Sequence, residues 1–229
     1  LKRRKFQLTR ETSVSQWLDE AGQTGVLRRH LWEPLCLAAL NTPAEYASAQ
    51  LFANVLRDSL GSRRREDTDL LLPRVNLGEL LPEPASRWLE SQGAELRLGT
   101  RVHDIHPDAD GITIDGTAFA ATILACAPQH AAALWPAGAT DYAFEPIATV
   151  YLQFGRQPKM PFPLTNLLGT LGQWVVDRGN GLLACVLSGH GDWEKLEDEA
   201  LASALENELV MPERARWRKV IREKRPTFS

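Results

Sequence analysis

The chain has 229 residues, with 26 lysine and arginine side chains against 29 aspartate and glutamate side chains, so its formal charge is −3. This balance leaves no excess of positive charge for a polyanion and argues against a nucleic-acid-binding domain. Apolar residues make up 44% of the chain and charged residues 24%. These fractions exclude disorder as the main state and predict a packed core, in one large domain or two small ones.

The cysteines indicate the compartment in which the chain works. Cys36, Cys126 and Cys185 lie far apart, each in an apolar run, which is typical of buried thiols rather than of a disulfide framework. We therefore expect a reducing, cytoplasmic environment. No stretch approaches the roughly 18 consecutive apolar residues of a membrane span, and the basic start LKRRKFQLTRE lacks the apolar region of a signal peptide. Because the chain begins at Leu1 and shows no cap or turn signal at either end, we expect a piece of a longer protein.

The first 60 residues predict three helices. Ser13 can cap a short one, and residues 26–40 carry apolar side chains at helical spacing, with Pro34 either kinking this run or starting its second half. Thr42 can cap a third helix that has Pro43 at its first position. The inner face of this third helix would hold Tyr46, Leu51, Phe52, Val55 and Leu56.

After a charge-rich segment at 61–69, which predicts a solvated loop, helices and strands mix. Helices are predicted at 83–92, 131–134 and 194–210. Strands are predicted at 94–98, 101–106, 112–114, 118–120, 122–127, about 147–154, 173–177, 182–187 and 217–222. Residues 122–127 form a continuous apolar run, as expected for a strand buried on both faces. Helices first and mixed strands later favour an α+β class, α/β in part.

The residues give no self-contained catalytic site. The glycine-rich stretches at 179–184 and 189–194 do not follow a strand and open a helix with the G-x-G-x-x-G spacing, so we expect a hairpin turn and a capped loop. His103 and His106 would point to opposite faces of a strand, and no metal site or catalytic residue is predicted. Cys126 lies in an apolar run, so it is not expected to be a reactive thiol. Such a chain is either a non-catalytic interaction module or part of an enzyme whose reactivity lies in a cofactor.

One stretch favours the enzyme. Residues 85–128, ASRWLESQGAELRLGTRVHDIHPDADGITIDGTAFAATILACAP, resemble a segment shared by flavin-dependent amine oxidases, phytoene-type desaturases and protoporphyrinogen oxidases. In that pattern a helix ends at a glycine, here Gly93, and a valine and an isoleucine follow three apart, here Val102 and Ile105. A hairpin comes next, and then a strand ending in alanine and proline, here 125–128.

Longer segments narrow the resemblance. DLLLPRVNLGELLPEPASRWLE, EPIATVYLQF and GQWVVDRG look like the squalene-associated FAD-dependent desaturases, the hydroxysqualene dehydroxylases of bacterial hopanoid synthesis. The resemblance covers nearly the whole chain. It implies a helical and mixed-sheet substrate domain joined to part of a Rossmann-like FAD-binding domain. The family's opening G-x-G-x-x-G loop and its final flavin-contacting segment do not occur here, so we expect an internal fragment whose own FAD binding is open.

The resemblance also implies a domain plan. Residues 1–80 would be the helical part of the substrate domain, 81–140 the partial FAD-binding domain with a strand pair, a hairpin and a buried strand, and 141–216 the sheet and helix part of the substrate domain. Residues 217–229 would be a return strand toward the FAD domain.

Few site residues carry over from the family. Four match positions near FAD: Val102, Ala125, Ala127 and Pro128. Two match positions on the strand layer over the flavin, where substrate binds: Gln173 and Trp174. Each has an ordinary alternative, namely a β-core valine for Val102, tight packing for the alanines and the proline, and a buried structural tryptophan for Trp174.

The function that the resemblance implies is FAD-dependent reductive removal of the hydroxyl of hydroxysqualene, giving squalene. A carotenoid-type desaturase and a flavin amine oxidase remain open within the same superfamily. The implied partner is an apolar isoprenoid substrate, not a nucleic acid. Squalene-pathway enzymes or the inner-membrane surface stay open as further partners.

Overall fold

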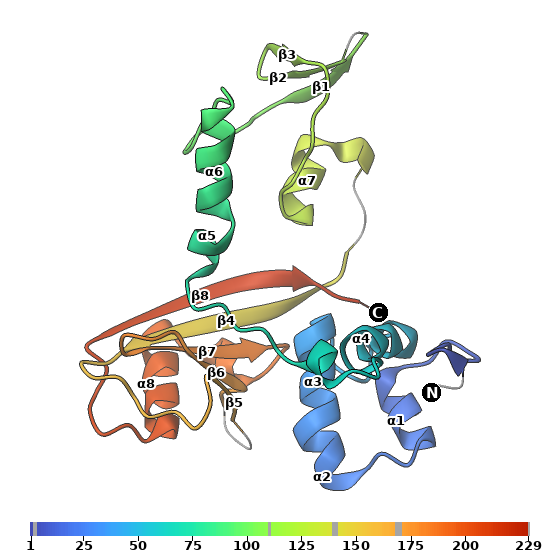
Figure 1. The fold of residues 1–229 in the computed structure, drawn as a ribbon, viewed down its shortest axis with the longest axis vertical. Helices are drawn as coiled ribbons and strands as arrows, with labels where there is room; N and C mark the ends of the chain where they lie inside the picture. The colour runs from blue at the N-terminus through green and yellow to red at the C-terminus, as the bar shows by residue number, and fades with distance from the viewer. Residues whose placement is uncertain (2–3, 110, 139–141, 168–170, 229) are drawn as a thin grey trace. The chain divides into compact units, whose positions relative to one another are not determined.

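A computed structural model of the chain describes residues 1, 4–109, 111–138, 142–167 and 171–228. The chain divides into two compact units, one made of Leu1–Ser62 with Tyr142–Ser229 and the other of Arg63–Asp141 (Figure 1). We call them unit 1 and unit 2. Helices and antiparallel sheets occur together, which confirms the predicted α+β class.

Unit 1 begins with a helical layer in which the predicted helices occur with shifted ends. Its elements are α1 (Val14–Glu20), α2 (Gly25–Leu27), a π-helical turn η2 (Arg28–Trp32), α3 (Glu33–Leu40) and α4 (Ala49–Leu60). Ser13 caps α1 as predicted, since its hydroxyl accepts from the N–H of Gln16 at 3.2 Å. These helices bury an apolar cluster that includes Val14, Cys36 and Phe52.

The cap predicted at Thr42 is wrong. The third helix starts six residues later, where the Ser48 hydroxyl accepts from Leu51 N–H at 3.3 Å. Thr42 is buried and its hydroxyl is engaged elsewhere, because it donates to the carbonyl of Leu40 at 2.7 Å and accepts from Phe228 N–H at 2.9 Å. Residues 43–47 therefore form turns, and Tyr46, expected on an inner face, is 71% exposed.

The run predicted as a kinked helix contains a π turn. Glu33 N–H donates to the carbonyl of Arg28, five residues back, and α3 starts at this glutamate. The ring nitrogen of Pro34 has no hydrogen to donate to the carbonyl of His30, four residues back, which favours a local change of helical pitch. The proline thus acts as expected, by starting the second half of the run.

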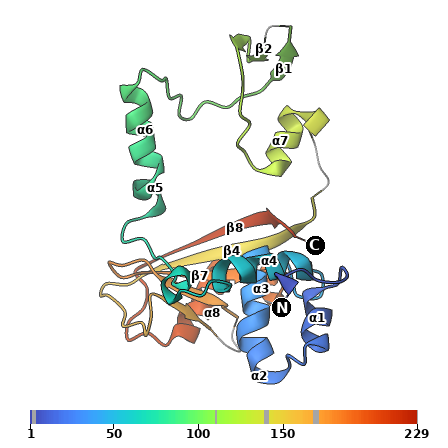
Figure 2. The ribbon, with the colours of Figure 1, turned by 45° about the vertical axis from the view of Figure 1, so that its right-hand side comes forward.

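The sheet of unit 1 has five antiparallel strands in the order β5-β6-β7-β4-β8. They are β4 (Phe144–Gln153), β5 (Leu164–Asn166), β6 (Trp174–Asp177), β7 (Leu182–Ser188) and β8 (Trp217–Pro226). Figure 2 shows β4 and β8 running together, and their ladder joins Phe144–Gln153 to Trp217–Pro226. The strands predicted near 147, 173, 182 and 217 are confirmed, whereas β5 was not predicted.

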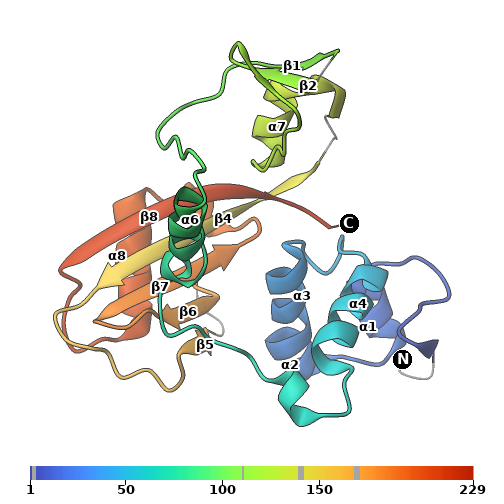
Figure 3. The same ribbon diagram turned by 45° about the horizontal axis from the view of Figure 1, so that its top comes forward.

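Alternating side chains of β4 and β7 build the main core. Helix α8 (Asp198–Leu209), preceded by a short 3-10 turn η5 (Asp192–Lys195), packs on one face of the sheet through Leu201 and Leu205. Figure 3 shows α1, α3 and α4 grouped apart from α8. The glycine-rich stretch at 179–184 is the predicted hairpin turn between β6 and β7, with positive φ at Gly179, Asn180 and Gly181.

One buried carboxylate ties α8 to the segment before β8. Glu206 is 3% exposed, and it accepts hydrogen bonds from the backbone N–H of Ala215 and from Arg218, with Arg214 at 3.4 Å. Burial opposes its ionisation, but the Ala215 N–H and then Arg218 outweigh burial, so the pKa of Glu206 lies below its usual value. The Glu206 carboxylate therefore has a structural role, since it joins α8 to Ala215 and to Arg218 of β8.

Unit 2 contains shorter elements. They are a 3-10 turn η3 (Arg65–Thr68), α5 (Leu77–Leu80), α6 (Pro82–Ser91), β1 (Ile105–Asp108), β2 (Gly111–Ile114), β3 (Thr117–Phe119), α7 (Pro128–Leu134) and a 3-10 turn η4 (Pro136–Gly138). The predicted helix at 83–92 is confirmed. The predicted hairpins are also confirmed, since β1, β2 and β3 form an antiparallel sheet, with Asp115 and Gly116 at φ 45° and 81° in the second turn.

Two predictions for unit 2 are wrong. Residues 94–98 and 122–127 are not strands, and at 101–106 only the end is a strand. Ile123, expected to be buried on both faces, is 92% exposed. A strand needs a neighbour to receive its backbone hydrogen bonds, and no described strand pairs with 122–127. Among the described residues, no helix is both long enough and apolar enough to cross a membrane.

Candidate functional site

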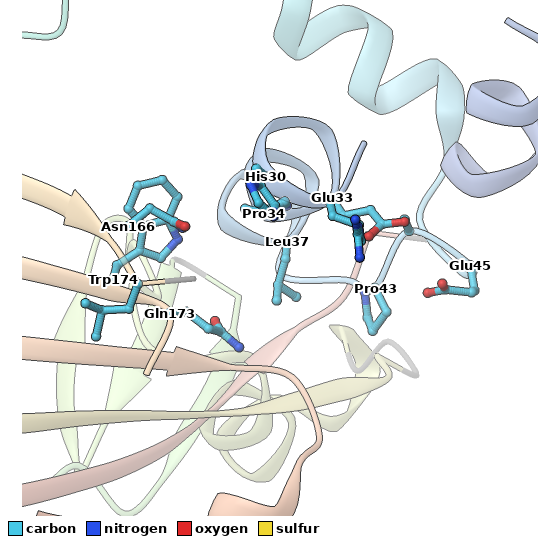
Figure 4. Close-up of a pocket in the computed structure, with 12 residues that line it drawn as sticks. His30, Glu33, Pro34, Leu37, Pro43, Glu45, Asn166, Gln173 and Trp174 are labelled. Carbon is cyan, nitrogen blue, oxygen red and sulfur yellow. The ribbon is translucent and has the colours of Figure 1, made fainter. Parts of the chain in front are cut away.

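A pocket of about 450 Å³ lies in unit 1 between the helical layer and the sheet (Figure 4). We call it the helix–sheet pocket. Its apolar walls are formed by Pro34 and Leu37 of α3, the loop residues Pro43 and Ala44, and Leu167 and Trp174 beside the sheet. The π turn and the start of α3, which are continuous, add three charged or polar side chains to the pocket: Arg29, His30 and Glu33. Its volume is in the range of small-molecule sites.

The structure brings together the two residues predicted on the substrate side. Gln173 and Trp174 both line the helix–sheet pocket, and Trp174 is the first residue of β6. The amide of Gln173 is already engaged, because its Nε2 donates to the Ser188 carbonyl at 2.7 Å and its Oε1 accepts from Ser188 N–H at 2.9 Å. Gln173 therefore extends the β6–β7 ladder, and its amide is not free to bind a ligand.

Asn166 is a pocket residue that the sequence prediction missed. It ends β5 opposite Trp174, and Figure 4 shows the two side chains on the same wall, with His30, Pro34 and Leu37 across from them. Its Oδ1 is buried and accepts no hydrogen bond. A strand of three residues has too little pattern to be recognised, and no motif marked this asparagine.

The lining residue Glu33 forms an ion pair with Arg28. Arg28 Nε donates to Glu33 Oε1 at 2.7 Å, and the same guanidinium pairs with Asp19 and donates to Ser15 Oγ at 2.6 Å. The hydrogen bonds to Glu33 and then to Asp19 raise the pKa of Arg28 above its usual value, so this guanidinium stays charged at physiological pH. The group of residues 15, 19, 28 and 33 fixes the π turn at the edge of the pocket.

A second pocket lies within unit 2 and has a volume of about 940 Å³. We call it the Val102 pocket. Of the four residues predicted near FAD, Val102 and Ala125 line it together, and Cys126 lines it beside them. Ala127 and Pro128 are not among its lining residues, since they form the cap and first residue of α7.

The Val102 pocket fits only part of an FAD. Its lining is mainly apolar, with Ile105, Ile114 and Leu124 beside Val102, and Thr122 Oγ1 is buried there without a partner. Such a surface suits an aromatic ring system with a polar edge. The sequence has no G-x-G-x-x-G loop, whose backbone N–H groups would hold the pyrophosphate.

The thiols differ in their environment. Burial raises the pKa of both Cys36 and Cys185 to about 12, with nearby carboxylates adding to the shift. Cys126, expected to be buried, is exposed. Across the described ranges, no three histidine, cysteine, aspartate or glutamate side chains are grouped as a metal site would need.

A family model described as flavin containing amine oxidoreductase matches residues 3–221. The chain belongs to this family, as the sequence resemblance predicted, and the enzymes of the family are flavin-dependent oxidoreductases.

Curated relatives narrow the similarity to one kind of enzyme. The chain is 27% identical to a hydroxysqualene dehydroxylase of Rhodopseudomonas palustris, over 92% of this chain and 53% of that protein. It is 32% identical to a hydroxysqualene dehydroxylase of Sinorhizobium fredii, over 66% of this chain and 38% of that protein. It is 25% identical to a hydroxysqualene dehydroxylase of Zymomonas mobilis, over 89% of this chain and 51% of that protein. The chain thus spans about half or less of the length of these relatives.

Solved structures show the same fold at low identity. An oxidoreductase from Methanosarcina mazei superposes with a TM-score of 0.63 at 10% identity, over 99% of this chain and 59% of that one. A putrescine oxidase redesigned in its cofactor binding gives a TM-score of 0.59 at 16% identity, over 86% and 49%. This likeness supports the fold of a flavin oxidoreductase and carries no information on substrate.

Proposed function

We propose that this chain forms the substrate side and part of the cofactor side of an FAD-dependent oxidoreductase that removes the hydroxyl of hydroxysqualene and yields squalene. The observation that carries the proposal is the similarity to three hydroxysqualene dehydroxylases, in two cases over about nine-tenths of the chain. The helix–sheet pocket supports it, because its walls include Pro34, Leu37, Leu167 and Trp174 and suit an isoprenoid chain.

The reaction would consume one proton and one hydride. The hydroxyl of hydroxysqualene is allylic, so it would take up a proton from the medium and leave as water, and the delocalised cation that remains would accept the hydride. A bound reduced flavin would supply that hydride and be oxidised. The contribution of this chain is to hold the isoprenoid against Trp174 and Leu37 and to keep water away from the cation.

The test uses the unbroken natural reading frame that contains these 229 residues. The purified protein is reduced without oxygen, hydroxysqualene is added, and flavin reoxidation is followed by absorbance while the products are identified by mass spectrometry. Reoxidation that produces squalene supports the proposal. A flavin that stays reduced refutes it in favour of a desaturase or an amine oxidase, and a protein without flavin refutes it in favour of a non-catalytic module.

We further propose that residues 81–140 belong to the FAD-binding domain, with Val102, Ala125, Ala127 and Pro128 on its cofactor side. Cys126 offers a direct probe, because it lies between two of these residues and is exposed. Alkylation of Cys126 should slow at least several-fold when FAD is present, whereas the buried Cys36 and Cys185 should stay unlabelled throughout. Equal labelling of Cys126 with and without FAD would place the cofactor elsewhere.

A further inference from the structure

The buried oxygen of Asn166 needs an explanation. Folded proteins rarely leave a buried polar atom unpaired, because such an atom has lost water without gaining another partner. Among the described residues that line the helix–sheet pocket, Asn166 Oδ1 is the one buried side-chain atom without a hydrogen bond. The unpaired atom is an acceptor, so the group that would satisfy it is a donor such as a hydroxyl.

Two of the polar side chains that line the pocket are already engaged. The amide of Gln173 is bonded at both ends to Ser188, and Glu33 is held by Arg28. The other neighbours of Asn166 in the pocket include the apolar side chains of Leu37, Leu167 and Trp174. Arg29, His30 and Glu45 complete the polar part of the lining. An acceptor that lies beside apolar side chains suits one hydroxyl on a largely apolar ligand.

The position of Asn166 is fixed by the sheet. It pairs with Trp174 across β5 and β6, and the backbone N–H of Leu167 donates to the Gln173 carbonyl at 2.8 Å. Paired residues on neighbouring strands project to the same face, so the acceptor and the indole line one wall. The wall therefore presents an aromatic surface for the hydrocarbon beside an acceptor for the hydroxyl.

We propose that Asn166 Oδ1 accepts a hydrogen bond from the hydroxyl of an isoprenoid alcohol and makes the helix–sheet pocket selective for alcohol over hydrocarbon. The inference deepens the proposed function, on which its choice of ligand rests. Reductive dehydroxylation removes the group that Asn166 holds. The product then leaves the acceptor unpaired again, so it binds more weakly than the substrate and is released.

The test compares two ligands on the unbroken protein with its flavin oxidised, so that no turnover occurs. Hydroxysqualene should bind about tenfold or more tightly than squalene, because the hydrocarbon leaves the buried acceptor unpaired. Asn166→Leu has a similar size without an acceptor, and it should reduce this preference to about twofold or less. The matched control is Thr165→Val, whose wild-type hydroxyl donates to the Phe162 carbonyl at 3.2 Å on the opposite face of the strand, and it should keep the wild-type preference.

The results separate this inference from the proposed function. An Asn166→Leu protein that keeps the preference for hydroxysqualene over squalene overturns the inference. A wild-type protein that binds both ligands equally also overturns it, and this second result does not depend on the folding of a variant. Squalene formation by reduced wild-type protein together with an unchanged preference in Asn166→Leu overturns the role of Asn166 alone. A preference that depends on Asn166 without squalene formation supports the role of Asn166 and overturns the dehydroxylation.

Discussion

Replacing Gln173 with leucine should destabilise the chain without creating a new ligand preference. The change removes two hydrogen bonds to the backbone of Ser188, and it leaves the N–H and carbonyl of that buried residue unpaired. Each lost bond is worth about 1 kcal/mol and each stranded group adds to the loss, so the free energy of unfolding should fall by about 2–4 kcal/mol. With a urea dependence of about 3 kcal/mol per M, the unfolding midpoint should fall by about 1 M.

The assay is urea unfolding followed by far-UV circular dichroism. Gln16→Leu is the control, since the oxygen of this exposed amide accepts from the Thr12 hydroxyl at 2.6 Å. The free energy of unfolding of this control should change by less than about 0.5 kcal/mol. If Gln173→Leu unfolds like the wild type but binds hydroxysqualene many-fold more weakly, the amide serves the ligand rather than Ser188. The role derived from the structure would then be wrong, and the role implied by the sequence resemblance would be right.

Three further predictions follow from buried or strained groups. Because the pKa of Glu206 is lowered in the folded state, its contribution to stability should be complete above the unfolded pKa of about 4.3 and be lost as pH falls through the folded pKa. In urea unfolding, Glu206→Gln should lower the free energy of unfolding by about 2–4 kcal/mol at pH 7. The same variant should weaken the pH dependence of the free energy of unfolding below about pH 5. Gly181→Ala should lower the melting temperature far more than Gly22→Ala, since both have positive φ but a Cβ at Gly181 would lie 2.6 Å from a carbonyl oxygen, whereas the space at Gly22 is open. Cys36 and Cys185 should resist iodoacetamide at pH 8 until urea unfolds the chain, as mass spectrometry can show, because burial keeps their thiols protonated; labelling in the folded state would contradict the packing.

The fold was predictable where local pattern and tertiary pairing agree. The helix at 82–91, the hairpins at 105–119 and the strands β4, β6, β7 and β8 carry clear alternation, caps or turns, and each strand has a pairing partner. The partner of β8 is β4, which lies far from it in the sequence. The run at 122–127 was mispredicted because apolar composition indicates that a segment favours burial but not which strand would pair with it. In the described structure none does, and Ile123 stays exposed.

The helix cap shows a different limit. Thr42 and Ser48 both carry a hydroxyl suited to capping, and Pro43 strengthened the wrong choice. What decides between them is a contact with Phe228, far along the chain, which takes the Thr42 hydroxyl away from the helix. The residues near Thr42 in the sequence therefore could not have predicted its hydrogen bond with Phe228.

The candidate site was predictable only in part. Gln173 and Trp174 could be placed by family resemblance, and both line one pocket. Asn166 could not be placed, because its significance comes from an unpaired oxygen, a property of three-dimensional packing. The four cofactor-side residues stay a prediction, with two of them on a common pocket and two at the start of α7.

The bond between Thr42 and Phe228 spans 186 positions of sequence, with all of unit 2 synthesised in between. The apolar cluster of the helical layer draws only on residues up to Leu56, so it can pack before unit 2 is synthesised, whereas the hydrogen bond to Phe228 forms only after nearly the whole of this stretch has emerged. Such long-range closure slows folding, because chain entropy is lost before the contacts that reward it form. The residues around Phe228 therefore dock last, onto a helical layer whose apolar cluster can already be closed.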